Sequence, residues 1–301
     1  MSFINGIPGA VAQGLIWGIM AIGVYITFKI LDIADLTVDG SICTGAAVST
    51  MLIINGVNVW IALICAIVAG MLCGLITGLF HTLLGIPAIL SGILTQLMLW
   101  SINLTIQSSK ANISVAARNY DVILSQLKNY QAIITLTVIS VIIIALLYWF
   151  FGTEFGCGLR ATGCNISMSR AQGINTSFNK VFGLAISNGI VALSGALLSQ
   201  YQGASDINMG RGAIVIGLAA VIIGEALLSR IAKNFAFRLL SVIIGGIVYY
   251  IVLQGVISLG FDSNLLKMIT ALVVGLFLGI PHLKSTYFNK SRRKKEVQAD
   301  A

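Results

Sequence analysis

The chain is organised around one polar stretch, Gly158-Leu159-Arg160-Ala161-Thr162-Gly163-Cys164-Asn165-Ile166-Ser167-Met168-Ser169-Arg170-Ala171-Gln172-Gly173-Ile174-Asn175-Thr176-Ser177-Phe178-Asn179-Lys180-Val181-Phe182. This stretch carries Arg160, Arg170 and Lys180 and no acidic residue, and it separates two apolar halves that look alike. A short basic piece between apolar spans suits docking onto a soluble partner. It equally suits a cytoplasmic loop made basic by membrane topology alone.

Composition identifies the class of protein. Of the 301 residues, 57% are hydrophobic and only 9% are charged, and the mean hydropathy is +0.97. A soluble domain carries about 25% charged residues, so this chain is too poor in charge to cover a water-facing surface. The net charge of +8 does not indicate nucleic-acid binding, because the excess lies in loops and in the tail. We therefore predict an all-α polytopic membrane protein.

The apolar runs predict eight or nine transmembrane segments, because a full span needs about 17–25 residues. The second and seventh runs are short and rich in glycine, so we expect them to be broken or tilted. The first run is too long for the apolar region of a signal peptide and is taken as a span. The runs cover residues 9–30, 41–55, 57–79, 86–106, 131–151, 181–200, 212–229, 237–258 and 264–281.

The distribution of lysine and arginine residues predicts the orientation of the chain in the membrane. The tail Lys284–Lys295 is strongly basic and should be cytoplasmic, which places 158–180 on the same side and the N-terminus outside. If one short run is re-entrant, the N-terminus lies inside instead. The predicted regions are a first membrane repeat (1–106), an extracellular loop (107–130), a linking span (131–151), a cytoplasmic coupling segment (152–180), a second repeat (181–283) and a basic cytoplasmic tail (284–301).

Two similar blocks predict that the halves are inverted repeats. Asp35-Leu36-Thr37-Val38-Asp39-Gly40-Ser41 precedes the second run, and Asp206-Ile207-Asn208-Met209-Gly210-Arg211-Gly212 precedes the seventh. Because one linking span separates two sets of four segments, the second set is inverted. Inverted repeats with interrupted helices at matching positions are typical of transporters and indicate the transport path. Chance similarity between two glycine-rich stretches is the alternative.

Four residues of these blocks are candidates for the pathway or its gates: Asp39, Asp206, Asn208 and Arg211. Irregular backbone at membrane depth needs protein or a water-filled cavity around it. The simpler role is structural, with Asp35 and Asp39 capping the helix that follows them and Asp206 pairing with Arg211.

Other polar or small residues within the apolar runs have structural interpretations. Glu225 is predicted to be a structural intramembrane acid with Arg230 or Lys233 as partner. Two sets of glycines spaced four residues apart would form ridges on one face of a helix, and these glycine ridges predict close helix packing within or between subunits. Several amides and one tyrosine could line a pathway or join helices. The ridges are Gly70, Gly74 and Gly78, and Gly14 and Gly18; the polar set is Gln96, Asn103, Gln107, Asn188, Gln200 and Tyr201.

Several chemistries are excluded. The sequence has no G-x-x-x-x-G-K-[ST] motif, so we expect no ATP site of the P-loop kind in this chain. His81 and His282 have no orienting acid nearby, and we expect no catalytic residue. The five cysteines form no C-x-x-C pair, so neither a metal site nor a disulfide framework is expected.

The coupling segment resembles that of bacterial ABC-importer permeases of the branched-chain amino acid and ribose type. The pattern there is G-x-x-x-R-A-x-G-x-N, a short helix, and A-x-x-x-G-I-[ND]; it begins here at Gly156. The blocks at Asp35–Ser41 and Asp206–Glu225 resemble a lipoprotein-dependent subgroup, some of whose members are assigned to tryptophan or tyrosine. The chain departs from the pattern at Ser169-Arg170, where an acidic residue is common.

The resemblance implies the remaining parts of an importer. Two permease copies would form the pathway between them, and an extracellular lipoprotein would deliver the ligand to loops 107–130 and 201–211 in the bacterial cytoplasmic membrane. Two separate ATPase subunits would hold ATP and Mg and switch the pathway between its two states. By the resemblance, the ATPase-coupling residues are Arg160, Gly163, Asn165, Arg170, Ala171, Gly173 and Ile174. The competing class is a secondary transporter driven by an ion gradient, which would need buried carboxylates at mid-membrane.

Overall fold

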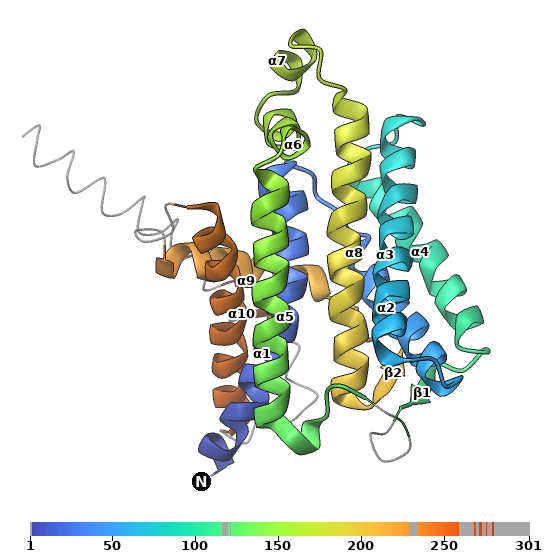
Figure 1. Ribbon diagram of the computed structural model, residues 1–301, viewed down its shortest axis with the longest axis vertical. Coiled ribbons are helices and arrows are strands. Elements are labelled where there is room, and N and C mark those ends of the chain that lie inside the picture. Colours follow the sequence, from blue (N-terminus) through green and yellow to red (C-terminus); the bar gives the residue numbers. More distant parts are fainter. Residues whose placement is uncertain are drawn as a thin grey trace, which may run out of the picture.

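The computed structural model describes residues 2–115, 120, 122–228 and 234–258, with scattered positions between 268 and 279. This part of the chain is almost entirely helical (Figure 1). The helices are α1 (Ser2–Tyr25), continued by the π-helix η1 (Ile26–Ile30), α2 (Val38–Ile54), α3 (Val59–Thr82), α4 (Ala88–Ile106), the 3₁₀ turn η2 (Gln126–Lys128), α5 (Asn129–Phe151), α6 (Glu154–Cys164), α7 (Ile166–Ala171), α8 (Thr176–Gln202), α9 (Ala213–Leu228) and α10 (Phe235–Ser258). Two short strands, β1 (Asn112–Ser114) and β2 (Ala204–Asp206), pair antiparallel.

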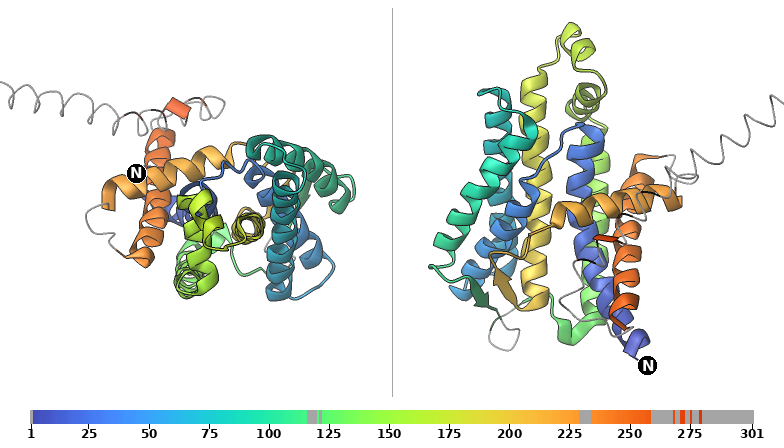
Figure 2. Two further views of the ribbon diagram at one scale, coloured as in Figure 1. Left: turned by 90° about the horizontal axis from the view of Figure 1, so that it is seen from above. Right: turned by 180° about the vertical axis from the view of Figure 1, so that it is seen from behind.

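The predicted apolar runs are confirmed as helices wherever the structure describes them. Six helices are long and apolar enough to cross a membrane: α1 with η1, α3, α4, α5, α8 and α10. The second and seventh runs form the shorter helices α2 and α9, and the ninth run lies almost entirely outside the described residues. In Figure 2, α9 runs across the bundle rather than along it, as a broken segment would.

Local sequence explains where several of the helices begin and end. Asn58, Thr153, Asn165 and Asn175 each precede a helix, and their side-chain oxygens accept backbone N–H groups of the first turns of α3, α6, α7 and α8. Such caps satisfy N–H groups that have no partner within the helix. Gly203 ends α8 with a φ of 72°, a left-handed conformation that favours glycine.

The packing is reciprocal, as two inverted repeats require. The two most extensive helix contacts join α1 to α10 and α3 to α8, so that the first helix of each half packs on the third segment of the other. In Figure 1, α1 rises from the N-terminus while α8 descends from α7 to β2, so the two run in opposite directions.

The predicted glycine ridges make these contacts within one subunit. A Cβ added at Gly14 or Gly18 would meet Ile247 or Ile243 of α10. The ridge of α3 lies equally close to α8, with the carbonyl oxygen of Leu184 against Gly74. The absence of side chains at the ridges therefore sets the spacing of the bundle.

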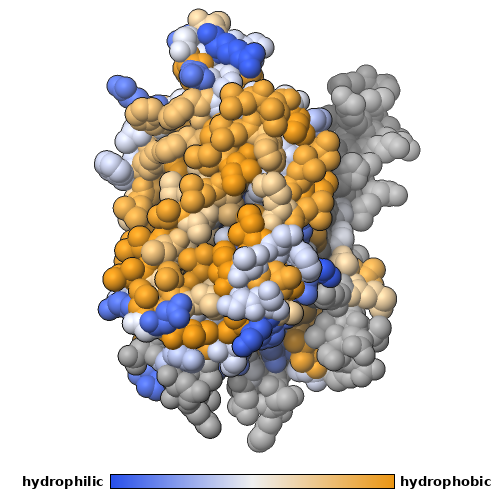
Figure 3. Space-filling view, turned by 90° about the vertical axis from the view of Figure 1, so that its right-hand side faces the viewer, coloured by the Kyte–Doolittle hydropathy of each residue, from blue (hydrophilic) through white to orange (hydrophobic). Residues whose placement is uncertain are grey.

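The outer surface suits a membrane. The face formed by α3 and α4 shows a broad hydrophobic belt with hydrophilic atoms at both ends (Figure 3). Trp60 and Ile64 of α3, Leu97 of α4 and other large apolar side chains of these two helices are exposed. Helices α6 and α7 project beyond one end of the bundle, whereas β1, β2 and the N-terminus lie at the other end (Figure 1). The N-terminus is thus opposite the coupling segment, as predicted for an outward-facing N-terminus.

Candidate functional site

The two broken helices meet at one junction, and Asp39 joins them. Its Oδ2 accepts the N–H of Gly212 at 2.9 Å, and its Oδ1 accepts the N–H of Ile214 at 3.0 Å. Asp39 lies in the first turn of α2, yet the N–H groups that it satisfies belong to the start of α9. Its predicted capping role is therefore right in kind, but the sequence assigned it to the wrong helix.

Asp35 anchors the start of α2 to the centre of the bundle. Its Oδ1 accepts the N–H of Thr37 at 2.9 Å, and its Oδ2 accepts the side-chain amide of Asn188, from α8, at 2.7 Å. Ser41 donates to the amide oxygen of Asn188 at 2.6 Å, and the hydroxyl groups of Thr37 and Thr77 lie 2.7 Å apart. Asn188 thus joins helices, which was one of its two predicted roles.

The predicted pairing of Asp206 with Arg211 is wrong, because the described structure contains no such ion pair. Asp206 instead accepts the N–H of Asn208 at 2.6 Å and the side-chain amide of Asn112 at 3.4 Å. It closes the turn after β2 and ties that turn to β1. The two outer segments 107–130 and 201–211 are therefore joined through β1 and β2.

A small cavity of about 130 Å³ opens at the junction, between α2, α4 and the turn after β2. Asp39 and Arg211 both line it, whereas Asp206 and Asn208 do not. Helix α4 contributes Gln96 and Asn103, for which lining a pathway was one of two predicted roles, and also Trp100, which sequence reasoning missed. Only the fold could indicate Trp100, since nothing in its local sequence distinguishes it from a lipid-facing aromatic residue.

The remaining polar candidates join parts of the bundle. Gln107 donates to Ser205 at 2.7 Å, and the hydroxyl group of Tyr201 donates to Asn129 at 2.9 Å. Gln200 accepts the N–H of Ile123 at 3.3 Å. None of these three side chains lines the junction cavity.

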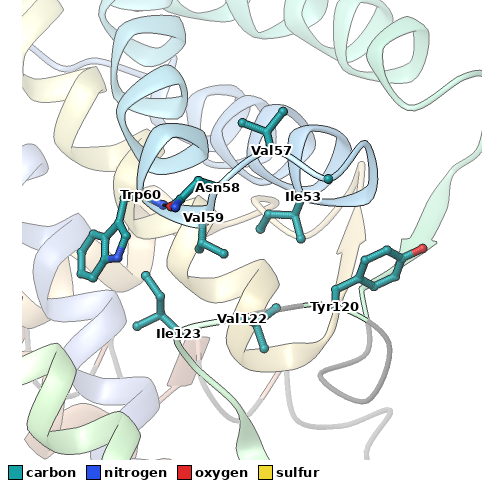
Figure 4. A pocket seen from close by; sticks show the side chains of 9 residues that line it. Ile53, Val57, Asn58, Val59, Trp60, Tyr120, Val122 and Ile123 are labelled. Atoms are coloured by element: carbon teal, nitrogen blue, oxygen red, sulfur yellow. Dashed lines mark hydrogen bonds between the residues drawn. The ribbon is translucent and has the colours of Figure 1, made fainter.

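A larger pocket of about 640 Å³ lies at the end of the molecule that carries β1 and β2. Figure 4 shows its two walls: one is formed by Val57 and Asn58, between α2 and α3, with Trp60 at the start of α3, and the other by Tyr120, Val122 and Ile123. The pocket is thus formed partly by the loop that was predicted to be extracellular.

The predicted ATPase-coupling residues divide into a half-buried set that packs on the membrane bundle and a mostly exposed set. Gly163 packs against the carbonyl oxygen of Ile30, and the guanidinium of Arg160 lies 4.3 Å from the ring centre of Phe235 and 5.3 Å from that of Phe151. These two residues hold α6 to the membrane bundle.

The exposed set lies on and after α7. Asn165 caps α7 through the N–H of Met168 at 3.0 Å, Arg170 donates to Thr176 at 3.0 Å, and Gly173 turns the chain with a φ of 79°. Asn165, Arg170, Ala171 and Gly173 are exposed, and Ile174 is half-buried. The segment thus presents a small, well-defined protruding surface.

Glu225 has a partner that the sequence analysis did not name. Its carboxylate lies 3.0 Å from Nζ of Lys29, in η1, whereas Arg230 and Lys233 lie outside the described residues. The ion pair joins η1 to α9. Sequence reasoning missed it because the two residues are far apart in the chain.

The capping geometry predicts how substitutions at Asp39 affect stability. Asp39→Asn leaves one carboxamide oxygen for two N–H donors, and Asp39→Ala leaves none. We expect the free energy of unfolding to fall by about 1 and about 2 kcal/mol respectively, measured by thermal unfolding of the purified protein. Asp32→Asn changes an exposed carboxylate in the connection before α2 and should have no effect. An equal loss in Asp32→Asn would contradict the capping role.

Comparison with known proteins identifies the family. Residues 7–281 match the family described as branched-chain amino acid transport system / permease component. The chain is 38% identical to a tyrosine transport system permease protein of Clostridioides difficile, over 97% of this chain and 99% of that protein. It is 24% identical to a fructose import permease protein of Bifidobacterium longum, over 89% of this chain and 75% of that protein.

An autoinducer 2 import system permease protein of Yersinia pestis is 26% identical over 68% of this chain and 58% of its own length. No solved structure matches the chain. The matched family, the helical membrane bundle and the protruding coupling segment agree with one another. The chain therefore belongs to the branched-chain amino acid transport system permease family and is the membrane permease subunit of an ABC importer, with ATP hydrolysis left to a separate subunit.

Proposed function

We propose that this permease imports an aromatic amino acid through a pathway formed with a second copy of the chain. The observation that carries the proposal is the 38% identity to a tyrosine transport system permease across nearly the whole of both chains. The relatives named for fructose and autoinducer 2 are more distant, at 24% and 26% identity. The junction of α2 and α9, with Asp39 and Arg211, forms part of the gate of that pathway.

The ATPase docks on the surface formed by α7 and the adjoining ends of α6 and α8. Phe155, Ile166, Met168 and Phe178 are exposed on this protruding surface. A groove of about 540 Å³, lined in part by Phe155, Ile174 and Phe178, lies beside them. Exposed apolar side chains in water favour a protein partner, and Arg170 adds a cation to the same surface.

A continuous set of contacts leads from this surface to the junction. Gly163 of α6 backs onto η1, Lys29 of η1 pairs with Glu225 of α9, and the opposite end of α9 is capped by Asp39. A π-helical turn such as η1 often marks a functional site. A displacement of α6 by the ATPase would reach the gate through η1 and α9.

A binding lipoprotein delivers the ligand at the opposite end of the molecule. β1 and β2 join the two predicted contact loops there, and the 640 Å³ pocket of Figure 4 opens beside them. With α6 and α7 facing the cytoplasm, positive-inside topology also assigns the basic C-terminal tail to the cytoplasm.

The test of the substrate class uses the importer purified with its ATPase and lipoprotein and reconstituted in nanodiscs. We expect ATP turnover to rise several-fold when the lipoprotein is supplied with L-tyrosine or L-tryptophan, and to stay at its basal rate with D-fructose. Stimulation by fructose and not by either aromatic amino acid would overturn the substrate class.

A further inference from the structure

We propose that the junction cavity is a subsite for the α-amino and α-carboxylate groups of the transported amino acid. The inference rests on the proposed function and adds to it a site within the permease itself. The site recognises the zwitterionic head group, while the side chain of the ligand extends towards the exposed face of α4.

The walls of the cavity are held firmly in position. A Cβ at Gly40 would lie 2.9 Å from Leu99 of α4, and Gly210 packs against the carbonyl oxygen of Asp39. The N–H of Gly210 also donates to Sγ of Cys43 at 3.2 Å. Because α2 touches both α4 and the turn at these glycines, the cavity of about 130 Å³ is preformed.

The cation at the cavity suits a carboxylate. Arg211 is exposed, and no described carboxylate forms an ion pair with it. It lies two residues before α9, whose first N–H groups are already capped by Asp39, so the guanidinium of Arg211 is the group that faces a ligand carboxylate. Arg211 can bind a ligand carboxylate through two parallel hydrogen bonds.

Acceptors on the other walls suit an ammonium group. Asn103 lines the cavity and is 1% exposed, and its carboxamide oxygen is buried without a described partner. The only hydrogen bond of its side chain in the described structure is a long one of 3.5 Å, from the amide nitrogen to the carbonyl oxygen of Gly40. Asp39 supplies a negative charge beside it. An ammonium group of the ligand would satisfy this acceptor, which is otherwise costly to bury.

The size of the cavity limits recognition to the head group. Leu97 and Trp100, which are 65% and 44% exposed, form its apolar margin on α4. An aromatic side chain of the ligand can pack against Trp100. An uncharged sugar would leave Arg211 without a complementary charge.

The experiment pairs each residue with the ligand group that it recognises. The purified importer complex, in nanodiscs without the lipoprotein, is titrated with L-tyrosine, with tyramine, which lacks the carboxylate, and with 3-(4-hydroxyphenyl)propionate, which lacks the ammonium. Saturation-transfer difference NMR gives each dissociation constant. Arg211→Gln should weaken the binding of L-tyrosine about 10- to 100-fold and leave the dissociation constant of tyramine unchanged. Asn103→Leu should weaken the binding of L-tyrosine and of tyramine. It should leave the dissociation constant of the propionate unchanged.

Two further variants keep the result interpretable. Arg211→Lys retains the charge without the two-pronged geometry and should lose only part of the affinity for L-tyrosine. Lys110→Gln removes an exposed cation outside the cavity and should change nothing. Equal weakening of all three ligands by Arg211→Gln would overturn the assignment.

The outcomes also separate this inference from the proposed function. If the wild-type importer transports L-tyrosine but binds none of the three ligands without the lipoprotein, the subsite is wrong and the function stands. If it neither transports nor binds L-tyrosine, both are wrong.

Discussion

Replacing both Met168 and Arg170 with glutamate should release the ATPase from the purified importer while leaving the membrane bundle folded. Both side chains are exposed on α7, and Met168 is 59% exposed. The apolar side chain of Met168 and the cation of Arg170 would both be replaced by a carboxylate that has to be buried against the ATPase. We expect each replacement to cost about 2 kcal/mol or more of binding free energy, or roughly 30-fold in affinity. The measurement is the ratio of ATPase to permease after affinity purification and gel filtration.

Two comparisons make the expected loss specific to the docking surface. Lys110→Glu reverses a charge at the opposite end of the molecule and should leave the ratio unchanged. Arg160→Glu should instead lower thermal stability, because its guanidinium packs over Phe235 and Phe151. An ATPase that co-purifies with the Met168/Arg170 double variant at the wild-type ratio would contradict the docking surface.

Exchanging Asp35 and Asn188 should restore much of the stability that either single change removes. Asp35 is 2% exposed, and Asn188 donates to it at 2.7 Å. Asn188→Asp places two carboxylates in one buried site and should cost about 3–5 kcal/mol. Asp35→Asn leaves an amide facing an amide and should cost about 1–3 kcal/mol.

The double variant, Asp35→Asn with Asn188→Asp, rebuilds the network with the charge on the other helix. The amide introduced at position 35 can still accept the N–H of Thr37 and can donate to the carboxylate introduced at position 188, which still accepts the hydroxyl group of Ser41. Only the bond from position 188 to the carbonyl oxygen of Leu184 is lost. Thermal unfolding of the four purified proteins gives a coupling energy, which we expect to exceed about 1 kcal/mol. A double variant less stable than both single variants would contradict the network.

Hydropathy and glycine content predict much of this fold because both act locally. An apolar run of sufficient length has to be a helix in a membrane, and the short glycine-rich runs were correctly assigned as the broken segments α2 and α9. The glycine ridges likewise indicated close packing, although the sequence could not tell whether it occurred within or between subunits.

The partners of the polar residues could not be predicted, because they depend on long-range packing. Asp39 has the residue type and position of a cap, but the free N–H groups nearest to it belong to α9, more than 170 residues later. Arg160 matches a docking motif, yet the fold brings Phe235 beneath it. Glu225 pairs with Lys29, which lies almost 200 residues earlier in the chain, so local sequence could not indicate this ion pair.

The central claim is that ATP hydrolysis by a partner drives transport through this chain. The most direct test is uptake of labelled L-tyrosine by proteoliposomes that contain the permease, its ATPase and its lipoprotein, with ATP in the lumen and ionophores that abolish every ion gradient. We predict uptake that requires ATP, persists with the ionophores and stops when the ATPase is omitted. Uptake that proceeds without the ATPase and collapses with the ionophores would contradict the claim, and would assign the buried Asp35 and the half-buried Asp39 to ion coupling instead.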